Sequence, residues 1–75
     1  MDEATLSQLN RIYAAVDLVS DLEGQDSGLV IEMSQAMLND LIEGRGFAPM
    51  ADYIRHYCDV LDSPEEDAER IAADI

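Results

Sequence analysis

Residues 29–43 read LVIEMSQAMLNDLIE, and they carry the widest apolar helical pattern in the chain. At about 100° per residue, the apolar positions cover an arc of about 220°, whereas a surface helix needs an apolar stripe of only ~100°. We therefore predict a helix over 29–43 that is covered on two sides. Its central apolar residues are predicted to lie in the core or in a dimer interface: Val30, Met33, Met37 and Leu41.

The segments on either side of this stretch also carry local signals for helices and turns. Upstream, residues 4–22 place apolar side chains at spacings of three and four, which predicts a helix with a stripe about 140° wide. Residues 24–28, GQDSG, predict a turn in which Asp26 or Ser27 caps the following helix. Downstream, Gly44 predicts the end of the central helix as a C-terminal cap.

Two more helices are predicted in the second half of the chain. Residues 49–62 carry an apolar face at helical spacing, with Pro49 in the first turn. Residues 63–66, SPEE, match a capping box, in which Ser63 caps the helix and Glu66 follows three residues later. A short helix to Ile75 should follow. We therefore expect an all-α fold, a small antiparallel bundle of three main helices and a short C-terminal helix, in one acidic domain over residues 1–75.

The small size of the chain favours self-association. A 75-residue chain buries only roughly 60–65% of its unfolded surface, so such scaffolds usually add disulfides, a metal or a second subunit. The single cysteine, Cys58, cannot form an internal disulfide and is interpreted as a small core residue. The only histidine, His56, points to a different helix face from Cys58, so no metal or other cofactor is expected. A homodimer is the remaining prediction.

The charge of the chain indicates its class of partner. It holds 17 acidic residues and four arginines, with a net charge of −13 and no lysine. Such a surface repels phosphates and anionic lipids and attracts basic proteins. The N-terminal residues lack the order of a signal peptide, and no apolar run approaches the ~20 residues needed to span a bilayer. We expect a cytoplasmic protein that binds neither membranes nor nucleic acid directly.

Several acidic residues stand where local helix energetics disfavour them. Asp17 and Asp21 are four apart on one helix, and like charges at this spacing cost a few tenths of a kcal/mol. Asp21 and Asp62 are expected at helix C-termini, where the helix dipole disfavours anions. Residues placed against local preference are candidates for function. The predicted partner-binding residues are Asp17, Asp21, Asp52, Asp59, Asp62, Glu65, Glu66 and Glu69.

These features predict a binding protein and not an enzyme, because no nucleophile stands beside a general base. The rows of carboxylates favour an inhibitor that binds a basic nucleic-acid-binding protein by mimicking or blocking nucleic acid. Small phage-encoded antagonists of restriction and CRISPR systems have this size and charge. The alternative is a structural or regulatory adaptor that binds a partner helix through an apolar face, with the acids serving solubility.

A third hypothesis comes from a short resemblance. Residues 26–33 read DSGLVIEM, which resembles the segment of acyl carrier proteins where Asp-Ser-Leu opens the second helix. The resemblance implies a phosphopantetheine group on Ser27. Gly28 stands in the place of the family's leucine, and the turn before Ser27 is shorter than the loop of carrier proteins.

Overall fold

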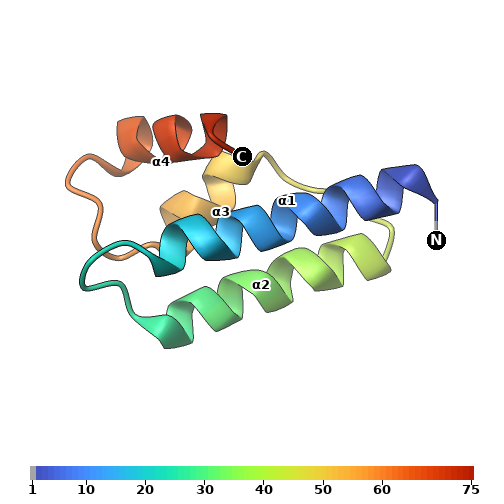
Figure 1. The fold of residues 1–75 in the computed structure, drawn as a ribbon, viewed down its shortest axis with the longest axis horizontal. Helices are drawn as coiled ribbons and strands as arrows, with labels where there is room; N and C mark the ends of the chain where they lie inside the picture. The colour runs from blue at the N-terminus through green and yellow to red at the C-terminus, as the bar shows by residue number, and fades with distance from the viewer. Residues whose placement is uncertain (1) are drawn as a thin grey trace.

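The computed structural model describes residues 2–75, and Met1 lies outside the described part. These residues form helices without any strand, which confirms the predicted all-α class (Figure 1). The four helices are α1 (Glu3–Ser20), α2 (Ser27–Ile42), α3 (Met50–Tyr57) and α4 (Pro64–Ala73). None of the described helices is both long and apolar enough to cross a membrane.

Aspartate side chains cap the N-termini of α1 and α2. The carboxylate of Asp2 accepts a hydrogen bond from the Thr5 backbone N–H at 2.8 Å. The carboxylate of Asp26 accepts one from the Gly28 backbone N–H at 2.7 Å, so Asp26 is the cap of α2. The helix consequently begins at Ser27. The prediction of a turn through Gly28 was wrong, since Ser27 and Gly28 are the first helical residues.

The predicted C-terminal cap of α2 is confirmed. Gly44 has a φ of 71°, a left-handed conformation that glycine adopts without steric cost. Its backbone N–H donates to the Leu41 carbonyl oxygen at 3.3 Å, and the Arg45 N–H donates to the Asp40 carbonyl oxygen at 3.2 Å. These two bonds form the Schellman pattern that satisfies the last carbonyl groups of a helix.

Helix α3 is shorter than predicted, because it ends at Tyr57 rather than near residue 62. The side-chain amide of Gln25 donates to the Tyr57 carbonyl oxygen at 3.2 Å and accepts from the Asp59 backbone N–H at 3.1 Å. These backbone groups lie beside the end of the helix, where carbonyl groups lack helical partners. Cys58 is extended, with φ −85° and ψ 117°. A side chain 32 positions away thus takes the place of a further helical turn.

Helix α4 begins at Pro64 as predicted, but its capping differs from the predicted box. The Ser63 side chain makes no capping hydrogen bond. The Ser63 backbone N–H donates to the Asp67 carboxylate at 3.2 Å, so Asp67 has the role predicted for Glu66. This backbone hydrogen bond, together with one from the Arg70 side chain, lowers the pKa of Asp67 below its ordinary value.

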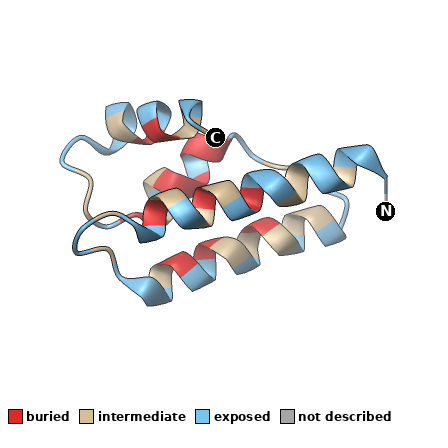
Figure 2. Cartoon of the chain, in the orientation of Figure 1, coloured by how far each residue is buried: buried red, intermediate tan, exposed pale blue. Residues whose placement is uncertain are grey.

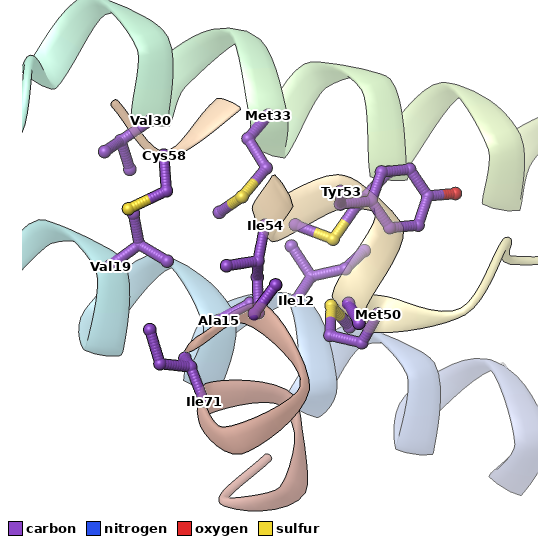
Figure 3. Packing of buried hydrophobic residues seen from close by; sticks show 13 residues of the cluster. Ile12, Ala15, Val19, Val30, Met33, Met50, Tyr53, Ile54, Cys58 and Ile71 are labelled. Carbon is purple, nitrogen blue, oxygen red and sulfur yellow. The ribbon is translucent and has the colours of Figure 1, made fainter. Parts of the chain in front are cut away.

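One core cluster is shared by all four helices. Ile54 of α3 is fully buried, and Figure 3 shows it among side chains of α1, α2 and α4. The predicted core-or-interface residues of α2 belong here: Val30, Met33 and Met37 are buried, and Leu41 is half-buried against them. Cys58 is also buried, in agreement with its interpretation as a small core residue.

The wide apolar arc of α2 is covered only in part. This helix packs against α1 and α3, and its buried residues face them (Figure 2). Ile31 and Ile42 lie beyond this contact, with 57% and 79% of their surface exposed. The two neighbouring helices therefore account for the centre of the arc, and its far flank stays uncovered.

Candidate functional site

The connections α1–α2 (residues 21–26) and α3–α4 (residues 58–63) lie side by side at one end of the long axis (Figure 1). Besides the two bonds of Gln25, the Asp26 backbone N–H lies 3.5 Å from a carboxylate oxygen of Asp59. A Cβ atom at Gly24 would lie 3.7 Å from a methyl group of Val60, which is ordinary packing contact. Two loops far apart in the sequence thus form one surface.

This surface concentrates carboxylates. Each connection brings its own acidic residues, and the adjoining last turn of α1 and first turn of α4 add more. Asp67, also in the first turn of α4, is paired with Arg70 and is not counted. We call the carboxylates here that have no arginine partner the acidic end: Asp17, Asp21, Glu23, Asp26, Asp59, Asp62, Glu65 and Glu66. Six of the eight predicted partner-binding residues belong to it. Glu23 and Asp26 were missed, because spacing along one helix does not reveal which loops meet.

The other two predicted residues, Asp52 and Glu69, lie beside Arg55 instead. The Arg55 guanidinium is 2.7 Å from Asp52 and 3.7 Å from Glu69. Arg55 and Glu69 line an open hollow of about 720 Å³ together with Glu65 and Glu66. The arginine therefore offsets part of the negative charge at Asp52 and Glu69, and it shares this hollow with Glu65 and Glu66 of the acidic end.

Among the described residues, no arginine forms a salt bridge with a carboxylate of the acidic end. Arg45 bridges Asp40 at 3.1 Å and Glu43 at 2.7 Å, next to the C-terminus of α2. Arg70 pairs with Asp67 at 3.3 Å. With the two partners of Arg55, five of the 17 carboxylates are paired, which leaves 12 without an arginine in the described part. All eight members of the acidic end are among these 12.

The positions within the acidic end differ in their local energetics. Asp21 is the C-terminal cap residue of α1, where the helix dipole disfavours an anion. Glu65 and Glu66 occupy the first turn of α4, where the dipole favours one. Asp62 lies in the connection and not at a helix C-terminus, so that prediction was wrong, because α3 ends at Tyr57. The unfavourable pair is therefore Asp17 and Asp21, one turn apart on α1.

Cys58, Tyr53 and His56 lie in three different surroundings. Cys58 is buried, and burial raises the pKa of its thiol, which disfavours the reactive thiolate. Tyr53 is buried, and its hydroxyl donates to the Asp40 carboxylate and accepts from the Ala48 backbone N–H at 3.3 Å. Burial and the bond to Asp40 raise the pKa of Tyr53. The exposed His56 ring packs edge-on against Tyr57, with ring centroids 4.6 Å apart.

Within residues 2–75, no group of three or more His, Cys, Asp and Glu side chains is arranged to hold a metal ion. Ser27, the residue singled out by the carrier resemblance, is exposed at the first position of α2, directly after the capping Asp26. The chain matches no protein-family model, no curated protein and no solved structure.

Proposed function

We propose that this protein is a non-enzymatic antagonist whose acidic end binds the basic surface of a nucleic-acid-binding protein in place of the nucleic acid. The observation that carries the proposal is the convergence of eight carboxylates, none paired with an arginine, on two adjoining loops and the helix ends beside them. Systems that cut or silence foreign DNA are one class of target with such basic surfaces.

The physical basis is electrostatic complementarity. A groove that binds phosphates presents arginine and lysine side chains, and carboxylates form charge-assisted hydrogen bonds with the same groups. A concentrated patch of one sign accelerates association with its opposite, and the effect falls steeply as salt increases. Binding would also relieve the repulsion between neighbouring carboxylates such as Asp17 and Asp21.

We also propose that the four helices form an antiparallel bundle that is a homodimer in solution. The support is the small size of the core and the large apolar side chains left exposed, Leu6, Tyr13, Ile31 and Ile42. A second subunit is one of the few ways in which a chain of this length can gain stability without disulfides or metals.

The experiment compares two triple variants with the same change in charge. The test variant D21K/E23K/D62K alters the acidic end at side chains that make no hydrogen bond within the described residues. The control variant E3K/E32K/D74K changes three exposed acids elsewhere. Both bring the formal net charge from −13 to −7, because each substitution adds two positive units. Circular dichroism establishes that both are folded.

Each protein is tagged and used to capture partners from nuclease-treated lysate of its host. The captured protein is then purified and mixed with a fluorescent nucleic acid that it binds, and displacement of this probe is measured by anisotropy. The wild type and the control variant should capture the partner and displace the probe, whereas the test variant should do neither. Equal displacement by both variants would contradict the proposal, as would a partner without affinity for nucleic acid.

The same samples separate the other two hypotheses. A partner that is held equally well in high salt, and by the test variant, would favour an adaptor that binds through apolar contacts. An intact mass increased by one phosphopantetheine group, and lost in the Ser27→Ala variant, would favour a carrier protein.

A further inference from the structure

Four large apolar side chains are exposed on the α1–α2 pair, in two sets of two. Leu6 and Tyr13 on α1 have 49% and 69% of their surface exposed. They are seven residues apart and thus lie within about 20° of each other around the helix. Ile31 and Ile42 on α2 are eleven residues apart and also lie within about 20° of each other. Each helix therefore carries one exposed apolar stripe.

Both stripes lie on the side of the helix pair that faces away from α3 and α4. On α2, the side chain of Asp40 reaches Tyr53 of α3, and it projects about 160–180° away from Ile31 and Ile42. On α1, the fully buried Ala15 faces the core and projects about 160–180° away from Leu6 and Tyr13. Because α1 and α2 are antiparallel neighbours, the two stripes form one surface. We call it the outer face: Leu6, Tyr13, Ile31 and Ile42.

The outer face is also nearly free of charge, in a chain where charged residues make up 28%. Residues 4–16 of α1 contain no acid, and residues 33–39 of α2 contain no charged residue at all. Between the apolar side chains stand uncharged ones such as Asn10 and Gln35. Asp17 follows Tyr13 by one turn, where the outer face meets the acidic end.

This distribution indicates what covers the outer face. A basic partner would gain from several carboxylates around its contact, whereas on the α1 stripe Asp17, within about 40° of Leu6 and Tyr13, is the carboxylate that borders this face. Two copies of a chain with a net charge of −13 repel each other, so they can approach only where neither carries charge. Depletion of charged residues and enrichment of aromatic and large apolar residues are features of interface cores.

We infer that the outer face is the interface of a symmetric homodimer, in which α1 and α2 of one protomer pack against α1 and α2 of its partner. This inference rests on the proposed homodimer and assigns its surface. With the same face on both subunits, the contact closes on itself, as twofold interfaces do. The acidic ends are left free at the surface of the dimer, so two copies of the binding site would be presented.

The size of the face fits a modest dimer. Helices of 18 and 16 residues side by side make a surface roughly 25 Å long and 20 Å wide. Two such faces together bury on the order of 1,000 Å², which is below the roughly 1,200–2,000 Å² of stable protein interfaces and near the minimum for a specific contact. We therefore expect a dimer whose population depends on protein concentration.

The test is sedimentation equilibrium over a series of concentrations. The wild type should show a monomer–dimer equilibrium, and I31E/I42E should weaken it by at least about 100-fold, because four apolar side chains per dimer are replaced by charges. The matched control A48E/A73E adds the same charge at exposed alanines outside the face and should dimerise nearly as well as the wild type. The variant L6S/Y13S tests the other helix without adding charge and should also be monomeric.

Each other outcome overturns part of the inference. A wild type that is monomeric at all concentrations would overturn the homodimer, and a dimer that persists in both outer-face variants would place the interface elsewhere. If the wild type is monomeric but I31E/I42E loses a lysate protein that A48E/A73E retains, the face binds a different protein. None of these results depends on the acidic end, whose binding is measured separately with D21K/E23K/D62K.

Discussion

The acidic end and the outer face are the two regions of this molecule that differ most. The first collects eight carboxylates from two loops and the helix ends beside them, and the second exposes Leu6, Tyr13, Ile31 and Ile42 with hardly any charge. Both are built partly on α1, and Asp17 lies where they meet. The net charge of −13 is therefore spread unevenly, and an average charge over the whole surface describes neither region.

The two regions should respond to salt in opposite directions. Ions screen attraction between the acidic end and a basic partner, so that binding should weaken as salt increases. Screening also reduces repulsion between two negative protomers, so dimerisation through the outer face should strengthen. The expected result is opposite slopes of log Kd against salt concentration for the two equilibria. Slopes of the same sign would show that both contacts have the same physical origin.

The largest expected effect is destabilisation of the whole domain, which would affect both regions, because both depend on the same core. Ile54 is fully buried among all four helices, and Ile54→Ala should cost about 2–5 kcal/mol. A domain of this length has a total stability of roughly 4–11 kcal/mol, so the variant should lose a large fraction of it. Urea denaturation followed by circular dichroism measures the loss. The control Glu32→Ala, at an exposed position of α2 outside the outer face, should change stability by only about 0.5 kcal/mol.

The second largest effect is expected at the acidic end alone and should leave the outer face unchanged. Gln25→Ala removes the side chain that joins the two connections at Tyr57 and Asp59, and should cost about 1–3 kcal/mol. Partner binding should weaken, whereas dimerisation should not change. The control is Gln8→Ala, because Gln8 is half-buried, like Gln25, and its amide makes no side-chain hydrogen bond within the described residues. Equal stability of the two variants would show that Gln25 does not hold the connections together.

A smaller effect of opposite sign is expected when charge is removed from the acidic end. D21K/E23K/D62K reduces like-charge repulsion and places a cation at the C-terminus of α1, so stability should rise by a few tenths of a kcal/mol per substitution. The urea midpoint measures this gain. A more stable variant that no longer binds the partner is the expected signature of charges retained for function at a cost in stability. A loss of stability would instead indicate that these carboxylates hold the fold.

The smallest effect distinguishes a structural carboxylate from the free ones beside it. The hydrogen bond from the Ser63 backbone, with that from Arg70, lowers the pKa of Asp67 in the folded state. Its stabilisation is therefore present above the unfolded pKa of about 3.8 and is lost as the pH falls through the folded value. Asp67→Asn should flatten the fall in stability below pH 3.8, measured by urea midpoints across pH. Asp62→Asn, in the adjoining connection, should leave this fall unchanged.

Local signals predicted the helices well where the helix ends are closed by neighbours in sequence. Asp26 caps α2 through Gly28, Gly44 closes it in a left-handed conformation, and Pro64 opens α4. Each of these contacts spans five residues or fewer, so the pattern and the structure agree. The prediction for the end of α3 failed because Gln25 acts there from 32 positions away. The capping box of α4 failed at short range, since Asp67, four residues after Ser63, takes the role predicted for Glu66.

The candidate site was predicted in part for the same reason. Counting charges along helices identified six members of the acidic end, and it also chose Asp52 and Glu69, which Arg55 partly neutralises. Glu23 and Asp26 joined the site only when the two connections met. The exposed flank of α2 followed from its wide apolar arc, but which residues stayed uncovered depended on where α1 and α3 pack.

The amino-acid sequence specifies the helical class, the caps within a turn of each helix end, and the net charge, because these depend on neighbours along the chain and on composition. Tertiary structure specifies where α3 ends, which acids converge, and which apolar side chains of α1 and α2 remain exposed. Those features depend on contacts between segments some thirty residues apart. Such contacts arise only when the helices share one core, and no local pattern encodes them.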